Sequence, residues 1–299
     1  MGRPARLDRQ SGRWALVDDI PFRMPVYCRN SPVLFAIFPI DADKARVLIP
    51  GSEIHPLRLW SKGLLVVSVI DYVDTNIGRY IEFSIAIACT HGSRPAPRLL
   101  PALLMGHYGT GKWVLDLPVS TEVSVKGGKG IWGMPKHQAH LNYIVGERTV
   151  SSQYDLDGQL AVKIEIDRPA SIPVPVSTAA VNYCGFRGML YKSTTYFNGK
   201  LGFRLFGKNS ARLTIGEHPR LAVLKELDIG RRPVLTAFLP QASGVLDDHF
   251  ECWFLAEAAL PDIVPEGMES VVSLGQSQQG LPPQGYVTAE EHLASRKNG

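Results

Sequence analysis

The residue best suited to covalent chemistry is Lys136, which ends an unusual run of glycine, tryptophan, methionine and proline. Residues 127–136 read Gly-Gly-Lys-Gly-Ile-Trp-Gly-Met-Pro-Lys, with four glycines in the first seven positions. Glycine permits positive φ or a close approach to another group. Pro135 fixes its own φ and biases Met134 towards an extended conformation. The pattern predicts a rigid turn that presents one amine, with Trp132 and Met134 close to it.

A lysine amine in such a setting is a candidate nucleophile. An ordinary lysine has a pKa of about 10.4, so only about one molecule in two thousand carries a neutral amine at pH 7. Burial or a neighbouring cation lowers a lysine pKa, and the neutral amine can then attack a ketone to form a Schiff base. Because most lysines are exposed, residue type alone favours a plain surface lysine at position 136.

The clearest strand pattern, Tyr80–Cys89, places a carboxylate among polar residues. Apolar and polar side chains alternate along it, so that the two kinds fall on opposite faces. Its apolar face holds Ile81, Phe83, Ile85 and Ile87, and its other face holds Tyr80, Glu82, Ser84 and Ala86. Periodicity alone favours a half-buried strand with Glu82 in solvent. The alternative is a barrel strand whose polar side chains line a cavity.

Three other motifs fail on their context. Gly106–Lys112 matches the start of a phosphate-binding loop, but the next residue is Trp113, and a strand rather than a helix follows. Gly128–Gly133 has dinucleotide-binding spacing, but Pro135 blocks the helix that such a motif must open. His137 and His140 are three residues apart, which on a strand places them on opposite faces and argues against a shared metal.

The elements that must position these residues are mainly short strands without a βαβ rhythm. This predicts an α+β, mainly antiparallel β fold, a sheet or barrel with a few peripheral helices. Helices are predicted for 41–49, 98–105, 219–227 and 288–296. Strands are predicted for 33–38, 64–70, 80–89, 113–117, 121–125, 140–145, 150–156, 160–166, 201–206, 213–215, 234–239 and 250–255.

A chain of 299 residues could form one large domain or two ordinary ones, and its composition is that of a globular protein. We expect a flexible N-terminus at 1–12, a single domain at 13–274 and a polar tail at 275–299 with a possible short helix. A net charge of +4 is too small and too dispersed to predict nucleic-acid binding. The four cysteines have no metal-like spacing, and no apolar run spans a bilayer. We therefore expect a cytoplasmic protein with no metal, no nucleic-acid partner and no membrane contact.

The run Trp132-Gly-Met-Pro-Lys136 closely resembles the WGxPK signature of the acetoacetate decarboxylase superfamily. That resemblance implies that Lys136 forms the Schiff base and that Glu82, on a strand similar to the family's acidic strand, is catalytic. Desolvation or a nearby cation is the established way of activating such a lysine, with acetoacetate decarboxylase as the known example. The similarity continues through residues 211–218, and in consistent order it spans residues 20–260. It implies the family's β-barrel or cone and a homo-oligomer.

The resemblance also implies substrate-binding residues and shows where this chain departs from the family. Arg29, Tyr80, Trp132, Met134 and His137 are the implied substrate-binding residues, although strict register puts Ser31 in place of Arg29. The family has a second lysine where this chain has His137, and a second cavity glutamate near Val67 or Ser68 is missing. A neutral imidazole supplies no fixed cation, so desolvation would have to activate the lysine.

Three functions remain open on the sequence. The first is decarboxylation of a small 3-oxo acid through a Lys136 imine, with Glu82 as the acidic partner. The second is a pyruvate aldolase-dehydratase that uses a Lys136 enamine, and the third is a binding barrel that kept the fold without turnover. The resemblance implies a small keto acid as the substrate. Neither enzyme needs a metal or organic cofactor, because the lysine imine is itself the electron sink.

Overall fold

The computed structural model describes residues 3–9, 11–169 and 174–255, and most of them lie in β-strands. In chain order the elements are α1 Arg6–Arg9, β1 Arg13–Val17, β2 Ile20–Met24, β3 Val26–Asp41, α2 Ala42–Val47, β4 Ile54–Pro56, β5 Lys62–Tyr72, β6 Asp74–Thr75, β7 Tyr80–His91, α3 Leu100–Leu103, β8 Gly111–Val119, α4 Glu122–Trp132, β9 Lys136–Gln138, β10 His140–Leu141, β11 Ile144–Val145, β12 Thr149–Leu156, β13 Gln159–Asp167, β14 Val174–Phe186, β15 Met189–Leu205, β16 Ala211–Ile215, the 3₁₀ helix η1 Pro219–Leu221, α5 Ala222–Lys225, β17 Leu235–Leu246 and β18 Glu251–Phe254.

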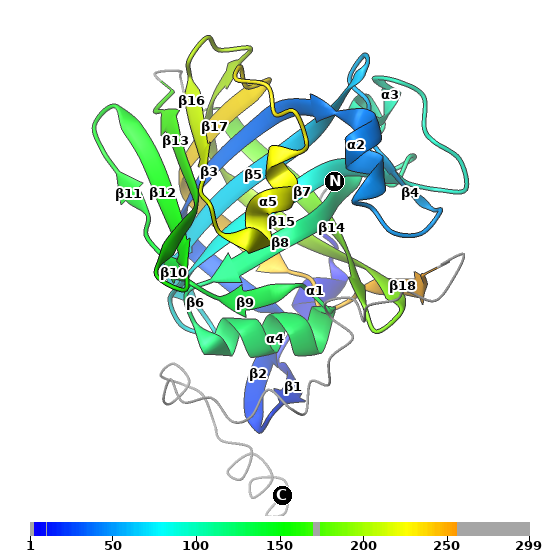
Figure 1. The fold of residues 1–299 in the computed structure, drawn as a ribbon. Helices are drawn as coiled ribbons and strands as arrows, with labels where there is room; N and C mark the ends of the chain where they lie inside the picture. Colours follow the sequence, from blue (N-terminus) through cyan, green and yellow to red (C-terminus); the bar gives the residue numbers. More distant parts are fainter. Residues whose placement is uncertain (1–2, 10, 170–173, 256–299) are drawn as a thin grey trace, which may run out of the picture.

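Seven strands close into a barrel. Their order is β7–β5–β3–β17–β15–β14–β8, and pairing between β8 and β7 completes the ring. Every neighbouring pair is antiparallel except β8 with β14. Helix α4 runs across one end of this barrel, next to the hairpin of β1 and β2 (Figure 1). The predicted α+β fold with a mainly antiparallel barrel and few helices is therefore confirmed.

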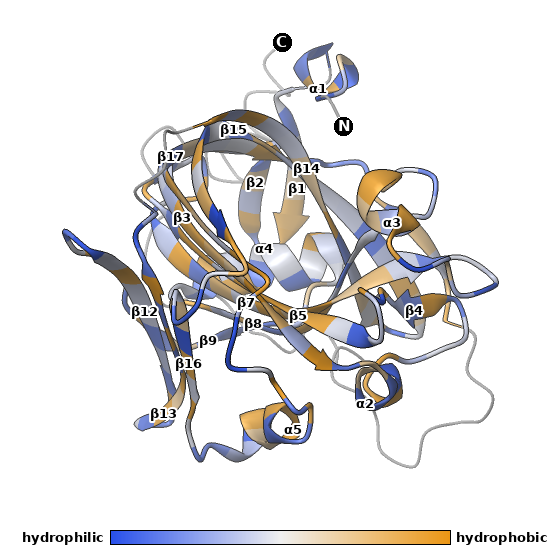
Figure 2. Cartoon of the chain, turned by 90° about the horizontal axis from the view of Figure 1, so that it is seen from above, coloured by the Kyte–Doolittle hydropathy of each residue, from blue (hydrophilic) through white to orange (hydrophobic). Residues whose placement is uncertain are grey.

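A second sheet covers part of the outside of the barrel. Its order is β10–β12–β13–β16, with β11 paired to β12. Seen along the barrel in Figure 2, this sheet forms a separate layer to one side. The largest apolar cluster lies between the two sheets and includes Val67 and Ile85 of the barrel, and Val162 and Ile164 of the second sheet. Both faces of several barrel strands are consequently buried.

This second layer explains the orientation of β7. Phe83, Ile85 and Ile87 point outwards into the cluster between the sheets. Glu82 and Ser84, on the alternate face, point into the barrel and line a cavity there. The interpretation that placed Glu82 in solvent is therefore wrong, because the apolar face of the strand packs outside the barrel.

Most predicted strands occur, and the predicted helices are short. Residues 41–49 contain α2, which is capped by the Asp41 carboxylate through the amides of Asp43 and Lys44. Residues 98–105 contain α3, and residues 219–227 contain η1 and α5. The long hairpin of β14 and β15 was missed except for its last part, since only the strand at 201–206 was predicted there. The helix predicted for 288–296 and the polar tail lie outside the described residues.

Part of the N-terminal segment, which was predicted to be a flexible arm, packs on the body of the protein. Residues 6–9 form α1, and Leu7 is 1% exposed. Arg6 donates to Asp247 Oδ1 from 2.7 Å, which holds this helix on the end of β17. No helix within the described ranges is long and apolar enough to span a membrane.

Candidate active site

The glycine-rich run lies within helix α4, so the turn predicted there and the strand predicted for 121–125 are both wrong. Thr121 caps the helix by accepting from the Ser124 amide, and Gly133 ends it with a φ of 63°. A left-handed residue at that position is the usual reason for a glycine C-cap. The helix therefore stops just before Met134 and Pro135, and Lys136 begins β9 directly afterwards.

The glycines in α4 allow other side chains to lie directly on the helix. A Cβ added to Gly128 would lie 2.3 Å from Lys136 Cδ, and one added to Gly127 would lie 2.6 Å from the Phe22 ring. Contacts that short do not occur between real carbon atoms. Gly128 therefore provides the groove in which the Lys136 stem lies. The glycine pattern serves close packing rather than a turn.

The structure brings together two of the residues predicted to be catalytic. Residue 136 pairs with Leu117 in the parallel β8–β9 register, and the lysine is 4% exposed. Its Nζ lies 2.8 Å from Glu82 Oε2 and donates to Ser124 Oγ at 3.1 Å. A buried amine is thus held between a carboxylate from the barrel wall and a hydroxyl from α4. The pair has the hydrogen-bond geometry that proton transfer requires.

Two stacked tyrosines extend this polar group. The rings of Tyr72 and Tyr80 lie 4.5 Å apart, and Lys136 Nζ lies 5.2 Å from the centre of the Tyr80 ring. The Tyr80 hydroxyl shares hydrogen bonds with Ser124 and Tyr72. Burial, followed by the charge of Glu82, raises the pKa of both phenols well above 10. Both tyrosines therefore stay protonated and provide neutral hydroxyl groups beside the amine.

The polar cluster faces a small cavity inside the barrel. Its volume is about 60 Å³, well below the several hundred cubic ångströms of a drug-sized site. Tyr80 and Met134, both predicted to bind substrate, line it. The wall also includes Val26, Tyr27, Cys28, Ser68, Ile70, Tyr72, Glu82, Ser84, Lys112, Val114, Leu117, Lys136, Ala180, Asn182, Thr195, Phe197 and Leu246. A cavity of this size and lining suits a small ligand with both polar and apolar parts.

Lys112, on β8, is a cavity residue that the sequence pattern did not identify. In the sequence it is the last residue of Gly106–Lys112, the run that resembles the start of a phosphate-binding loop. Its Nζ donates to Ser68 Oγ at 3.3 Å. Burial lowers the pKa of Lys112, while the charge of Glu82 acts in the opposite direction. The cavity therefore contains two lysines, and the negative charge of Glu82 acts on both of them.

A larger groove of about 670 Å³ lies outside the barrel, between β13, β16 and α5. It is open to solvent, and its charged residues carry both signs, for example Glu165 and Arg212. Exposed charges of this kind keep their hydration and are not activated by burial. Chemistry therefore favours the small barrel cavity over the larger groove.

His137 does not reach the cavity, which corrects its predicted role in substrate binding. It follows Lys136 on a strand and therefore faces the opposite side. Its Nε2 lies 2.9 Å from Asp116 Oδ1, which also accepts from Arg220 Nε at 2.8 Å. Burial opposes ionisation of Asp116, but the hydrogen bond from His137 and the charges of His137 and Arg220 give a net lowering of its pKa. His137 belongs to a structural ion network behind the active-site wall.

Arg29 and Trp132 also lie elsewhere. Arg29, on β3, is exposed, is absent from the cavity wall and pairs in register with Asp74. The indole of Trp132 is 2% exposed and donates from Nε1 to the Asp247 carbonyl oxygen at 2.8 Å. The predictions that these two side chains bind substrate in the cavity are therefore corrected. Trp132 instead anchors the end of α4.

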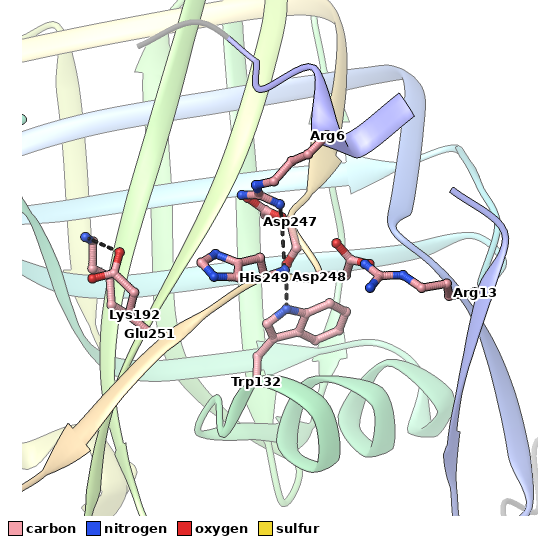
Figure 3. A network of polar contacts seen from close by, with 8 residues as sticks. All are labelled: Arg6, Arg13, Trp132, Lys192, Asp247, Asp248, His249 and Glu251. Carbon is pink, nitrogen blue, oxygen red and sulfur yellow. Dashed lines mark hydrogen bonds and ion pairs between the residues drawn. The ribbon is translucent and has the colours of Figure 1, made fainter. Parts of the chain in front are cut away.

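Figure 3 shows how that anchor extends into the N-terminal segment. The Asp247 carboxylate binds Arg6 and accepts from the His249 amide at 3.0 Å, while its backbone oxygen receives the Trp132 indole. Asp248, next in the chain, forms an ion pair with Arg13 of β1. These contacts tie the C-terminal end of α4 to β17 and to the N-terminal segment. They hold in place the helix on which the Lys136 stem lies.

The comparisons with known proteins agree with this architecture. The family model described as acetoacetate decarboxylase (ADC) matches residues 7–182. Acetoacetate decarboxylase from Legionella pneumophila has a similar structure, with 15% identity, a TM-score of 0.54, and 75% of this chain and 85% of that chain covered. The enduracididine biosynthesis enzyme MppR complexed with pyruvate gives 14% identity, a TM-score of 0.53, and coverage of 79% and 91%. These structural likenesses show a shared fold. No curated protein matches the sequence.

Proposed function

This chain belongs to the acetoacetate decarboxylase family, and from that premise we propose that it is a Schiff-base-forming lyase acting on a small keto acid. The observation that carries the proposal is the buried Lys136 amine, 2.8 Å from Glu82 in a cavity of about 60 Å³. A lysine with only a structural role does not require its stem to be held at one position, as the absence of a side chain at Gly128 allows here. A nucleophile gains a fixed position from the groove at Gly128.

Proton transfer between Glu82 and Lys136 begins the proposed reaction. The Glu82 carboxylate accepts a proton from the ammonium, and the neutral amine attacks the keto carbon to form a C–N bond. Protonated Glu82 then gives its proton to the resulting hydroxyl group, which leaves as water and yields the protonated imine. Ser124 accepts from the amine and is itself hydrogen-bonded to the Tyr80 hydroxyl, so the two hydroxyl groups hold the amine in place.

The imine then serves as the electron sink. In a 3-oxo acid, the bond between the carboxylate carbon and the adjacent carbon breaks, carbon dioxide leaves, and the electron pair forms an enamine with the imine nitrogen. Glu82, a carboxylate again after the dehydration step, takes up a proton from solvent and delivers it to that carbon, which regenerates the protonated imine. Addition of water to the imine then releases the ketone and the amine. The carbon chain of the substrate lies against apolar side chains such as Met134 and Val114.

A second reaction, pyruvate aldolase-dehydratase chemistry, is favoured by one observation, the cavity lysine Lys112. An ammonium near the substrate carboxylate stabilises its negative charge, and that charge is dispersed as carbon dioxide leaves. Such a contact binds the ground state more strongly than the transition state of decarboxylation. The carboxylate of pyruvate, in contrast, keeps its charge while Lys136 forms an enamine that attacks an aldehyde.

Borohydride trapping tests the shared step. Incubation with acetoacetate or pyruvate and borohydride should add one ligand mass, and peptide mass spectrometry should locate it on Lys136. Lys136→Ala should abolish the adduct, and Lys62→Met, which removes an exposed lysine from β5, should retain it. Carbon dioxide released alongside the trap would identify the decarboxylase. Absence of an adduct with both acids and with a panel of larger 2- and 3-oxo acids would refute the proposal.

Other properties predicted from the sequence are still predictions. A homo-oligomeric state, a cytoplasmic location and independence from any cofactor each need a measurement. Within the described ranges, no group of three or more His, Cys, Asp or Glu side chains is arranged to hold a metal ion. Activity measured before and after treatment with a chelator is the direct test of metal dependence.

A further inference from the structure

We propose that Lys112, with Ser68 and Ser84, forms the subsite that binds the substrate carboxylate. This inference rests on the proposed function, since it assigns the far end of the keto acid that Lys136 attacks. Lys112 provides a cation in the cavity, whereas Arg29 is exposed on β3 and does not line it.

The first support is the position of the Lys112 ammonium. The residue lies on β8, its side chain lines the same cavity as Lys136, and its Nζ donates to Ser68 Oγ at 3.3 Å. An ammonium has three donors and no acceptor, so one hydroxyl partner leaves capacity for an anion. Burial disfavours the charged form of this lysine, and a bound carboxylate would offset that cost directly.

The second support is a buried hydroxyl without a partner. Ser84 is 4% exposed and lines the cavity, and its Oγ has no hydrogen-bond partner among the described residues. Ser84 lies directly opposite Ser68 in the β5–β7 pairing. A buried hydroxyl left unpaired costs free energy. A carboxylate oxygen at this point would accept from both Ser84 and Lys112.

The third support is the spacing between this subsite and Lys136. Ser84 follows Glu82 by two residues on the same face of β7, so their Cα atoms are roughly 7 Å apart. Glu82 contacts the Lys136 ammonium at 2.8 Å. A short keto acid can therefore place its keto carbon at Lys136 and its carboxylate towards Ser84 and Lys112. The small cavity, about 60 Å³, favours a short acid over a long one.

The test compares ligands with and without a carboxylate in one trapping assay. For Lys112→Met, the acetoacetate or pyruvate concentration giving half-maximal adduct on Lys136 should rise about 30-fold, as expected for loss of a charged hydrogen bond. The same concentration for acetone, which lacks a carboxylate, should change less than threefold. Ser84→Ala should show the same pattern with a rise of about fivefold. Lys62→Met, the matched lysine control, should behave as wild type with every ligand.

A second measurement separates this proposal from the proposed function. Lactate and 3-hydroxybutyrate carry the carboxylate but cannot form an imine, so their binding by calorimetry reports the subsite alone. Wild type should bind them, and Lys112→Met should bind them about 30-fold more weakly. Equal binding by both proteins, or an equal rise for acetone and the keto acids, would overturn the subsite. Weaker hydroxy-acid binding by the variant, without any adduct in wild type, would support the subsite and refute the Schiff base.

Discussion

The groove at Gly128 gives a direct test of how Lys136 is positioned. Gly128 lies inside helix α4, where replacing glycine by alanine should favour the helix by about 0.8–1.0 kcal/mol. The new Cβ, however, would lie 2.3 Å from Lys136 Cδ and 2.7 Å from Cε. Gly128→Ala should therefore separate two quantities that usually change together, the stability of the helix and the position of the amine.

The size of the displacement follows from ordinary contact distances. Carbon atoms pack at about 3.5–4.0 Å, so the lysine stem would have to move by about 1.2 Å or more. The backbone of Lys136 is fixed by pairing with Leu117, and its Nζ lies between Glu82 and Ser124. The stem cannot move without carrying the nitrogen away from one of these partners. A misplacement of about 1 Å can cost a factor of about 100 in rate.

We therefore expect Gly128→Ala to form the borohydride-trapped adduct about 100-fold more slowly, with a melting temperature equal to or above that of wild type. Gly130→Ala is the matched control, since it makes the same substitution in the same helix. Its Cβ would meet Val17 of the N-terminal hairpin at 2.6 Å and would not touch the lysine. Its trapping rate should stay within about threefold of wild type, because the nitrogen is not displaced.

A Gly128→Ala protein that traps acetoacetate at the wild-type rate would refute this reasoning. It would mean that the stem takes another path and that Glu82 and Ser124 alone determine the position of the nitrogen. A large fall in melting temperature would also contradict it, because the clash would then have been absorbed by the helix rather than by the side chain.

Three further predictions concern the residues around the lysine. Glu82→Gln keeps the shape but cannot accept a proton, so adduct formation should slow by about 100-fold; Arg29→Ala, at the exposed site, should leave the trapping rate unchanged. His137→Ala should leave the pH dependence of trapping unchanged, because the ring faces away from the cavity. It should lower the free energy of unfolding by about 1–3 kcal/mol, measured in urea, because buried Asp116 loses a hydrogen bond. Asp116→Asn should flatten the acid limb of the stability curve: the pKa of Asp116 is lowered by folding, so its contribution is complete above about pH 4 and is lost as pH falls through the folded value. A wild-type slope in that variant below about pH 4 would show that other carboxylates dominate acid unfolding.

The sequence was sufficient to predict parts of β3, β5, β7, β8, β15 and β17, because their apolar runs or alternation are visible in the local pattern. It predicted no strand over β14. It was insufficient to predict α4, because glycine normally disfavours helices and Pro135 follows closely. Tertiary packing outweighs the low helix propensity of glycine. The side chains of Phe22, Val17 and Lys136 lie directly on the helix at its glycines. Such close approaches depend on segments distant in the chain, which a local pattern does not contain.

The same limitation explains why Glu82 was placed correctly only by resemblance. Alternation separates the two faces of β7 but does not say which face meets solvent. The apolar face with Phe83 and Ile85 usually marks the inside of a barrel, yet here a second sheet covers the outside. The apolar face of β7 packs against the second sheet, outside the barrel. Its polar face therefore lines the internal cavity.

Lys112 was missed because the predicted strand began at Trp113 and its cavity-facing side was not assigned. The faces of β8 are also separated by a shift of register. In an uninterrupted strand, residues 112, 114 and 116 would share one face. The β7–β8 pairing shifts between Ile85 and Ala86, however, so one extra residue of β8 is accommodated there. Lys112 and Val114 consequently face the cavity, while Asp116 turns outwards to His137.

This shift also gives His137 its partner, since it turns Asp116 towards the imidazole. Behind the wall, the residue after Lys136 meets a buried carboxylate, Asp116, and an imidazole there completes an ion network with Arg220. The cation inside the cavity comes instead from Lys112, on the far side of the same bulge. Glu82 interacts with both lysines. The second positive charge lies on β8, the strand paired with β9, and not on the residue that follows Lys136. The cation no longer adjoins the nucleophile along the chain and is free to contact the far end of a bound acid. This placement agrees with the proposed role of Lys136 and with the proposed carboxylate subsite at Lys112.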